Sequence, residues 1–370
     1  MSNDTTANEY DIPETMKAWV LGDPHEMKLI EKPVPVPGPA EVLVKVGAIA
    51  VCHTDIEVLH HGHPAMIEGE LPFNKEFVMG HEYMGTVVKT GPGVDEWQPG
   101  DRIAVEVHAG CGRCQKCREG MYTSCHNYSY RSKGHRANGF TTDGGFAEYA
   151  VNNINTLVPV PDYMSDCVAT LIVTAGTAMY GLDVLGGLIA GQSLVVAGAG
   201  PIGLMFIAVA KALGAAPVIM SEPRADRREM ATKLGADIVV DPTAEDPVAK
   251  VRSLTRGKGA DFSVEASGVP SVVNQVLHMT HRGGRVCLAA FSNDLTPTDL
   301  GYVVSNNIYM FGIRGEGNSA VKRVASLLEQ KRFDPTPIHT HTFPLEQADT
   351  AVSYAENQTD GAIKVVVKMC

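Results

Sequence analysis

The segment Ser193–Gly203, SLVVAGAGPIG, decides the fold of this chain of 370 residues. An apolar run leads into Gly198, Gly200 and Gly203, which have the spacing G-x-G-x-x-G. The first glycine permits a tight turn, the second lets a pyrophosphate approach the backbone, and the third lets the next helix pack against the strand. The N-terminus of that helix then faces the phosphates. The segment therefore predicts a strand, a turn and a helix that bind a dinucleotide.

The next apolar run, PVIMSEP, carries the acid that such a turn requires. Glu222 follows the last glycine by about 20 residues, where a carboxylate binds the adenosine ribose hydroxyls. That charge would repel the 2′-phosphate of NADP, whereas Arg224, Arg227 and Arg228 could accommodate it. NAD is therefore favoured over NADP. The alternative, three turn glycines and a solvated glutamate, is disfavoured by the strand-helix-strand context.

Two sequence patterns divide the chain. From Met16 to about Val160, short β-type runs alternate with Gly, Pro and Asp turns, which predicts a β-rich domain. After Pro161, apolar strands alternate with helical stretches at about Pro201–Leu213 and Ala225–Leu234, which predicts a parallel sheet with crossover helices. A chain of this length is expected to form two domains, or one domain with a large insertion. The final run, AIKVVVKM, is expected to return to the first domain.

Composition excludes several classes of partner. The chain has 42 acidic and 31 basic residues, a net charge of -11, and no basic stripe, so nucleic acid is not expected. No apolar window suggests a membrane-spanning helix, and a soluble protein is expected. The stretch Met1–Glu14 is polar and acidic and has no features of a signal peptide, which predicts a cytoplasmic protein with reduced cysteines.

Four of the eight cysteines form a cluster with metal-ligand spacing. Cys111, Cys114, Cys117 and Cys125 follow the pattern C-x2-C-x2-C-x7-C. Four thiolates can close a tetrahedral zinc site that has no position for a substrate, so its role would be structural. An iron-sulfur cluster or free thiols are the alternatives, although the spacing matches neither common ferredoxin pattern.

A second group of metal-binding residue types lies in VCHTDIE (51–57) and GHEYMG (80–85). Cys52, His81 and Glu82 could supply three ligands and leave a fourth position to water or substrate, as in a catalytic zinc site. Taken alone, such residues are more often a buried thiol and two surface side chains.

The run GHEYMGTVVKTGPGV (80–94) resembles the zinc signature of the zinc-containing medium-chain alcohol dehydrogenases. The four-cysteine cluster, GGFAEY, GAGPIG and GAIKVVV also occur in the order of that family. The resemblance is greatest to the sorbitol and threonine dehydrogenase branch. It implies an α/β fold: a GroES-like β-rich catalytic domain, residues 1–165 completed by 316–370, and a Rossmann domain with a doubly wound parallel sheet, residues 166–315.

The resemblance also implies roles for individual residues. Cys52, His81 and Glu82 would hold the catalytic zinc, and the four clustered cysteines a second, structural zinc. Thr54 would pass on the substrate proton, and Asp55 would orient the His81 imidazole. The implied cofactor contacts are Gly198, Gly200, Pro201, Ile202, Gly203, Glu222, Arg227, His53 and Lys364.

Two positions depart from the family pattern. Thr174 occupies the place at which relatives carry a further zinc ligand, Cys or Glu, and threonine is a poor ligand for zinc. This favours three protein ligands plus water and gives Glu82 more weight. Glu57 stands where many relatives carry the histidine that ends the proton relay, and a carboxylate can also accept a proton.

These features predict an NAD-linked, zinc-dependent dehydrogenase. Its substrate would be a secondary alcohol, a polyol or a hydroxy amino acid, and bound zinc would lower the pKa of the reacting hydroxyl. The family implies a homodimer or homotetramer. The alternatives are a zinc-free quinone or enone reductase of the same fold and a non-catalytic NAD-binding zinc protein, and zinc content separates them.

Overall fold

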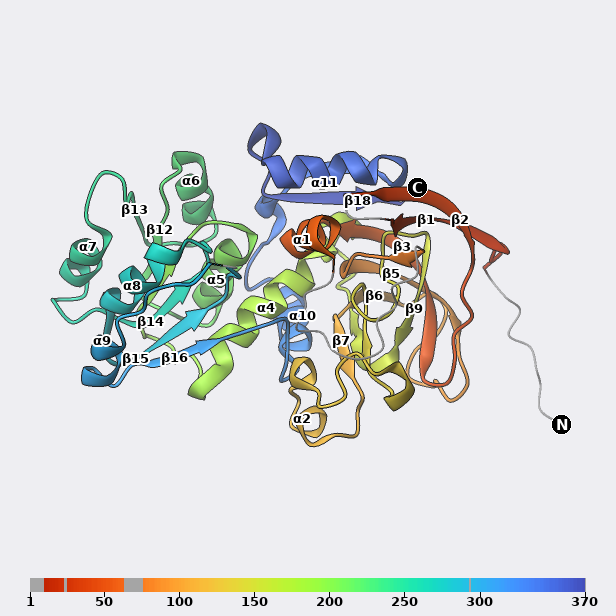
Figure 1. Cartoon of the computed structure of the whole chain (residues 1–370), viewed down its shortest axis with the longest axis horizontal. Helices are drawn as coiled ribbons and strands as arrows, with labels where there is room; N and C mark the ends of the chain where they lie inside the picture. The colour runs from red at the N-terminus through yellow and green to blue at the C-terminus, as the bar shows by residue number, and fades with distance from the viewer. Residues whose placement is uncertain (1–9, 23–24, 63–75, 293, 370) are drawn as a thin grey trace. The chain divides into compact units, whose positions relative to one another are not determined.

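The structure is a computed structural model that describes residues 10–22, 25–62, 76–292 and 294–369 (Figure 1). The chain forms two compact units. The first is Met1–Val173 together with His341–Cys370, and the second is Thr174–Thr340. Part of the predicted polar tail, residues 1–9, lies outside the described residues.

The first unit is β-rich, as its short β-type runs predict. Its strands are β1 (Thr15–Leu21), β2 (Met27–Pro33), β3 (Glu41–Ala50), β4 (Phe77–Val78), β5 (Glu82–Thr90), β6 (Arg102–Val105), β7 (His108–Gly110), β8 (Arg136–Ala137), β9 (Tyr149–Asn153), β10 (Leu157–Pro159), β17 (His339–Pro344) and β18 (Lys364–Lys368). Its helices are α1 (His53–His61), α2 (Gln115–Arg118), α3 (Asp166–Ala169) and α11 (Ala348–Asn357).

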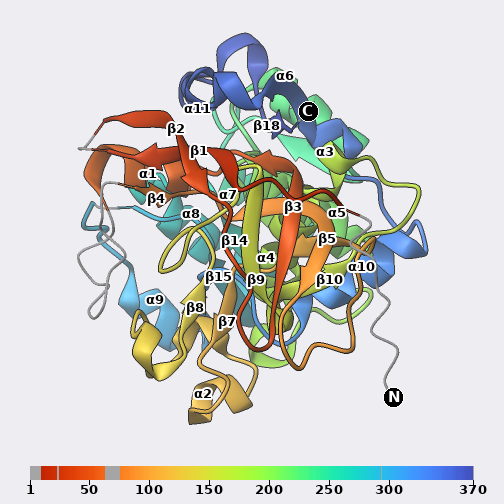
Figure 2. The same ribbon diagram turned by 90° about the vertical axis from the view of Figure 1, so that its right-hand side faces the viewer.

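The main sheet of this unit has the order β10-β6-β5-β3-β18-β17, with β9 also paired to β3. A smaller sheet has the order β2-β1-β4. In a further sheet β7 pairs with β8, and Figure 2 shows these two strands near α2. Buried side chains such as Val44, Ile49, Tyr83, Phe146 and Leu157 form a shared core. Burial of these side chains is the main driving force that holds the strands together.

The C-terminal strand returns to this sheet, as predicted. β18 is antiparallel to β3, with Val366 opposite Ala50, and the Val51 N–H donates to the Val365 carbonyl at 2.9 Å. In Figure 1 the blue strand β18 lies beside the red strand β3. Residues from both ends of the chain therefore meet in one sheet.

The second unit contains the predicted parallel sheet. Its strands are β11 (Leu194–Ala197), β12 (Val218–Ser221), β13 (Ile238–Val240), β14 (Ala260–Glu265), β15 (Thr280–Leu288) and β16 (Tyr309–Gly312). Its helices are α4 (Leu171–Asp183), which begins in the first unit, α5 (Pro201–Ala212), α6 (Ala225–Lys233), α7 (Pro247–Leu254), α8 (Pro270–Met279), α9 (Leu300–Ser305) and α10 (Ala320–Glu329).

The order of this sheet, β13-β12-β11-β14-β15-β16, is that of a doubly wound fold. Its neighbouring strands are parallel, with Leu194 of β11 opposite Val218 of β12 on one side and Phe262 of β14 on the other. The chain runs outward from β11 in one direction and then resumes at β14 on the other side. The carboxyl end of β11 therefore lies at the switch point where such sheets bind ligands.

The chain passes between the compact units a second time near its C-terminus. The resemblance predicts that the Rossmann domain ends near Glu316, and the second compact unit continues to Thr340. One reason is close packing of α4 and α10, since a Cβ at Gly176 would lie 2.6 Å from Val321. The functional domain boundaries remain a prediction.

One helical stretch contradicts the expectation that no segment could span a membrane. By length and composition alone, Asp166–Gly186 is long and apolar enough to cross a membrane. However, 67% of its most apolar part is buried inside the protein, and Leu171, Ile172 and Val173 have almost no exposed surface. This burial is typical of a core helix in a soluble protein.

Candidate active site and metal centres

Strand pairing brings the predicted catalytic zinc ligands together. Cys52 follows β3 and caps the N-terminus of α1, while Glu82 begins β5 directly after His81. β3 and β5 are antiparallel, with Ala50 opposite Glu82, so the end of one strand meets the start of the other. One ligand atom from each of Cys52, His81 and Glu82 lies within 4.8 Å of the other two.

The donor set fits zinc. A thiol, an imidazole and a carboxylate are the ligand types that zinc binds in proteins, and three of them leave a position open for substrate. His81 and Glu82 are 6% and 4% exposed, and Cys52 is half-buried. Within the described part of the chain, this group contains only these three potential ligands. Thr174, which is fully buried, belongs to the other compact unit.

Asp55 contacts two of the three predicted zinc ligands, His81 and Cys52. Its Oδ1 lies 3.2 Å from His81 Nδ1, and its Oδ2 accepts a hydrogen bond of 2.9 Å from the Cys52 N–H. Because Asp55 engages Nδ1, His81 Nε2 is the nitrogen left to bind a metal. Burial lowers the pKa of His81, but Asp55 and Cys52 together raise it well above its usual value. The site therefore favours a cation at this imidazole.

Lys364 joins this group, although the sequence analysis predicts it as a cofactor contact. Its Nζ forms an ion pair with Glu82 Oε2, and both side chains are almost fully buried. Burial lowers the pKa of Lys364, but Glu82, Cys52 and Asp55 outweigh this effect and raise it. This placement gives Lys364 a partner among the predicted zinc ligands, which sequence spacing does not reveal.

The predicted relay residues Thr54 and Glu57 both lie on α1 and have different contacts. The Cys52 thiol donates to Thr54 Oγ1 at 3.7 Å, so Thr54 lies next to the metal-binding side chains. Glu57 instead contacts His53, with its Oε1 3.5 Å from the His53 Nε2. The His53 side chain is 78% exposed, so this pair is on the solvent side of α1.

An aromatic contact that the sequence analysis does not identify packs on the histidine ligand. The Phe140 ring lies 4.7 Å from the His81 ring, centre to centre. The buried His108 ring is nearly parallel to the Phe140 ring, with 6.1 Å between their centres. This packing restricts the orientation of the His81 imidazole. No spacing rule connects these three residues.

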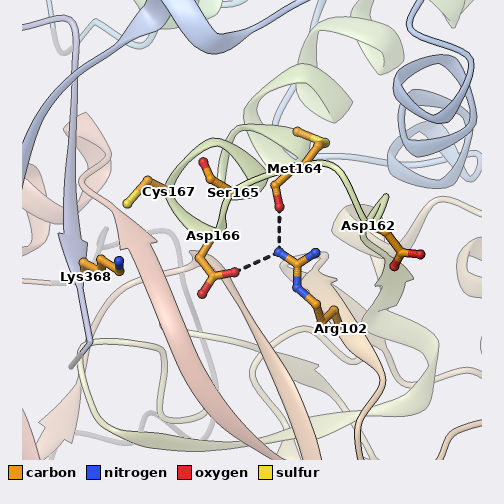
Figure 3. Close-up of a pocket in the computed structure, with 7 residues that line it drawn as sticks. All are labelled: Arg102, Asp162, Met164, Ser165, Asp166, Cys167 and Lys368. Carbon is orange, nitrogen blue, oxygen red and sulfur yellow. Dashed lines mark hydrogen bonds and ion pairs between the residues drawn. The ribbon is translucent and has the colours of Figure 1, made fainter.

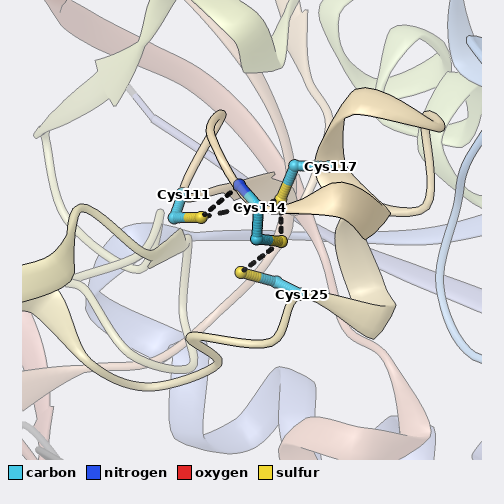
Figure 4. Close-up of side chains that lie close together, drawn as sticks. All are labelled: Cys111, Cys114, Cys117 and Cys125. Atoms are coloured by element: carbon cyan, nitrogen blue, oxygen red, sulfur yellow. Dashed lines mark hydrogen bonds between the residues drawn. The ribbon is translucent and has the colours of Figure 1, made fainter.

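The four clustered cysteines converge as predicted for a closed metal site (Figure 4). The Sγ atom of Cys114 lies 3.5 Å from that of Cys117 and 3.9 Å from that of Cys125, and Cys111 and Cys117 are 4.0 Å apart. A tetrahedral zinc with bonds of about 2.3 Å would separate its sulfurs by about 3.8 Å. The four sulfurs therefore fit zinc.

Hydrogen bonds favour the thiolate form of Cys111 in this cluster. Asn127 Nδ2 donates to Cys111 Sγ at 3.3 Å, and the Cys114 N–H donates to the same sulfur at 3.4 Å. Burial raises the pKa of Cys111, but these bonds and one from the Arg113 backbone lower it to about 6. The thiolate, which is the form that binds metal, is thus accessible at neutral pH.

The glycines of the nucleotide turn have the expected stereochemical roles. Gly198 has φ of 98°, a conformation that favours glycine. A Cβ at Gly203 would lie 1.9 Å from the Gly198 carbonyl oxygen, whereas one at Gly200 would meet nothing within 4 Å. Pro201 then begins α5, and Ile202 follows within its first turn. The turn can therefore receive a phosphate at Gly200.

Glu222 is fixed beside this turn. Its Oε2 accepts a hydrogen bond of 2.7 Å from the Ala199 N–H, and its Oε1 accepts one of 2.9 Å from the Arg224 N–H. The side chain is 7% exposed. Arg227, also predicted as a cofactor contact, is buried nearby on α6. The carboxylate is thus held at the carboxyl end of β12, next to the turn.

A cavity of about 500 Å³ in the first unit contains none of the predicted site residues (Figure 3). Its lining residues are Arg102, Asp162, Met164, Ser165, Asp166, Cys167 and Lys368. The Arg102 guanidinium is already bound by the Met164 carbonyl at 2.7 Å and by Asp166 at 2.8 Å. This cavity is not a candidate active site.

A unit with a nucleotide-type turn and a unit in which three zinc-ligand residue types converge are features of a metal-dependent dehydrogenase, and comparison with known proteins agrees. Residues 38–162 match the alcohol dehydrogenase GroES-like domain, and residues 201–330 match the zinc-binding dehydrogenase domain. The chain belongs to the zinc-dependent medium-chain alcohol dehydrogenase family. It is an oxidoreductase that acts on CH–OH groups, and the predicted fold class is confirmed.

The chain is similar to several named dehydrogenases. An L-threonine 3-dehydrogenase of Pyrococcus horikoshii is 39% identical over 85% of this chain and 88% of its own length. A sorbitol dehydrogenase of Bacillus subtilis is 29% identical over 97% of this chain and 98% of its own. The crystal structure of 2R,3R-butanediol dehydrogenase from Bacillus subtilis has a TM-score of 0.84 and 27% identity, covering 95% of this chain and 99% of that one.

Proposed function

We propose that this enzyme uses NAD to oxidise a secondary hydroxyl whose neighbouring carbon carries a hydroxyl or amino group. The observation that carries the proposal is the convergence of Cys52, His81 and Glu82, whose ligand atoms lie within 4.8 Å of one another. The proposal includes two zinc ions per chain, one at these three residues and one at the four clustered cysteines.

The side chains around the open site have distinct parts in this reaction. Zinc, when bound, supplies the Lewis acidity that lowers the pKa of the substrate hydroxyl. Asp55 keeps the His81 imidazole oriented through Nδ1. Thr54, next to Cys52, receives the hydroxyl proton and passes it on. Glu57, paired with His53 at the exposed face of α1, accepts it before it reaches solvent.

The neighbours of Glu222 support NAD as the cofactor. A 2′-phosphate on the ribose would be repelled by the Glu222 carboxylate unless an arginine compensated for it. Arg224 is paired with Asp226 at 2.8 Å. Arg228 donates to the Glu222 carbonyl at 2.8 Å and pairs with Asp241 at 3.0 Å. These arginines are engaged in other contacts, which weakens the case for NADP.

The substrate class rests on the compounds for which the relatives are named. L-Threonine, sorbitol and 2R,3R-butanediol each have a secondary hydroxyl next to a carbon that bears an amino or hydroxyl group. We therefore expect recognition of this second polar group as well as of the reacting hydroxyl.

The decisive assay follows NADH absorbance with L-threonine, sorbitol, 2R,3R-butanediol and 2-butanol. The last compound is the matched control, because it lacks the neighbouring hydroxyl of butanediol. At least one of the first three should be turned over with a higher kcat/KM than 2-butanol. A preference for 2-butanol over all three would contradict the proposed substrate class, and turnover without zinc would contradict the mechanism.

We also propose that the enzyme is a cytoplasmic homodimer or homotetramer. β16 is an edge strand of the parallel sheet, and the side chains of Tyr309 in this strand and Val304 in α9 are 57% and 76% exposed. An exposed strand edge with apolar side chains favours pairing with a second copy. The four-cysteine site requires reduced thiols, which supports the cytoplasm. Light scattering of the purified enzyme tests the oligomeric state.

A further inference from the structure

Lys364 is a buried lysine that lies against the metal-binding side chains. The antiparallel pairing of β18 with β3, continued by the bond from the Val51 N–H to the Val365 carbonyl, brings Lys364 alongside Cys52. From there its Nζ reaches Glu82 Oε2. Lys364 and Glu82 are 2% and 4% exposed. A fully buried ammonium is unusual and calls for a compensating charge.

The charges of a bound zinc and of the side chains named around it balance when Lys364 is counted. As a thiolate, Cys52 contributes one negative charge, and the carboxylates of Asp55 and Glu82 contribute one each. A zinc ion with two positive charges and the Lys364 ammonium bring the total to zero, with His81 neutral as a ligand. Without Lys364, the buried site would have a net negative charge. That excess would strengthen its attraction for any cation.

Lys364 also acts on Glu82 directly. A zinc ion bound to Glu82 would share this carboxylate with the ammonium at Oε2. The ammonium draws electron density from the carboxylate and repels a nearby divalent cation, so it weakens the bond between Glu82 and the metal. This effect is opposite to that of Asp55, an anion that strengthens the hold of His81.

We propose that Lys364 is a positioning residue that limits how tightly Glu82 binds the catalytic zinc and so keeps a coordination position open for the substrate hydroxyl. The inference rests on the zinc site of the proposed function. It gives a buried side chain of the last strand a role in the reaction without contact with the substrate. It also gives a function to the positive charge of this lysine, which opposes binding of a metal at the neighbouring carboxylate.

The test compares zinc release from wild type, Lys364→Met and Lys368→Met into excess chelator. Lys368 is the matched control, since it is an exposed lysine on the same strand. Cys52→Ala identifies the phase of release that belongs to the catalytic zinc, because this variant should lack that phase. This phase should be slower in Lys364→Met by about tenfold or more, the scale on which the partners of metal ligands affect metal affinity. Lys368→Met should release zinc like wild type.

A second readout separates positioning from a general effect on folding. With Co²⁺ in place of the catalytic zinc, the visible spectrum of Lys364→Met should differ from that of wild type, because Glu82 binds the metal differently. Lys364→Arg, which restores the positive charge, should return both the spectrum and the release rate towards wild type. If Lys364→Met does not fold, Lys364→Gln replaces it as the uncharged variant.

The outcomes are distinct. Slower release restored by arginine supports the inference, whereas equal or faster release from the uncharged variant overturns it. A wild-type enzyme with only one zinc per chain, held by the four cysteines, would instead refute the proposed catalytic zinc site. Failure of this inference and failure of the proposed function can therefore be told apart.

Discussion

Replacing Glu222 with glutamine tests the cofactor preference with little change in shape. The carboxylate accepts hydrogen bonds from the Ala199 and Arg224 N–H groups and is 7% exposed. A buried like-charge contact costs several kcal/mol, so its removal should shift the ratio of kcat/KM for NAD to that for NADP by at least about tenfold towards NADP. Glu229→Gln, at an exposed site on α6, is the matched control and should leave the ratio unchanged.

The same site predicts a difference in stability between two variants. Glutamine keeps one acceptor oxygen, so Glu222→Gln should lower the free energy of unfolding by ~1–2 kcal/mol. Alanine leaves both N–H groups without this acceptor, and Glu222→Ala should cost ~2–4 kcal/mol. Urea unfolding measures both values, and steady-state kinetics measure the cofactor ratio. An unchanged ratio in Glu222→Gln, together with normal folding, would show that the acid that selects the cofactor lies elsewhere.

Three further changes test other parts of the structure. Cys114→Ser should release the structural zinc and lower the melting temperature while the catalytic zinc stays bound; retention of both ions would refute the four-thiolate site. Gly203→Ala should weaken NAD binding by at least about tenfold, since its Cβ would lie 1.9 Å from the Gly198 carbonyl oxygen; unaltered NAD affinity would argue against this turn. Burial raises the pKa of Asp261, but hydrogen bonds from Ser193 and His281 outweigh this effect and lower the pKa overall. Ionised Asp261 therefore stabilises the fold above pH ~4, and this contribution is lost as the pH falls through the lower pKa of the folded state. Urea unfolding of Asp261→Asn should not show this pH dependence.

Local sequence signals predict the nucleotide-binding region well. The helix expected at about Pro201–Leu213 is α5, Pro201–Ala212, because proline at the first position and an apolar strand before it mark its start. The amphipathic helix α10 is not among the expected helices, yet Val321, Val324 and Leu328 are buried at helical spacing. That periodicity was available in the sequence.

Contacts between distant segments are harder to predict. The pairing of Lys364 with Glu82 depends on the register of β18 against β3 and of β3 against β5. A shift of one residue in either pairing would turn one of these side chains to the opposite face. The packing of Phe140 on His81 likewise depends on how two separate loops fold. Residue spacing contains no information on either contact.

The most direct test of the central claim is the zinc content of purified Glu82→Ala, with NAD affinity as the control for folding. If Cys52, His81 and Glu82 are the protein ligands of the catalytic zinc, removal of one leaves two, too few to hold zinc in a site that must also stay open. The wild-type enzyme should then contain two zinc ions per chain and the variant one, with NAD binding retained and turnover nearly abolished. Two zinc ions in the variant alongside normal NAD binding would contradict this ligand assignment.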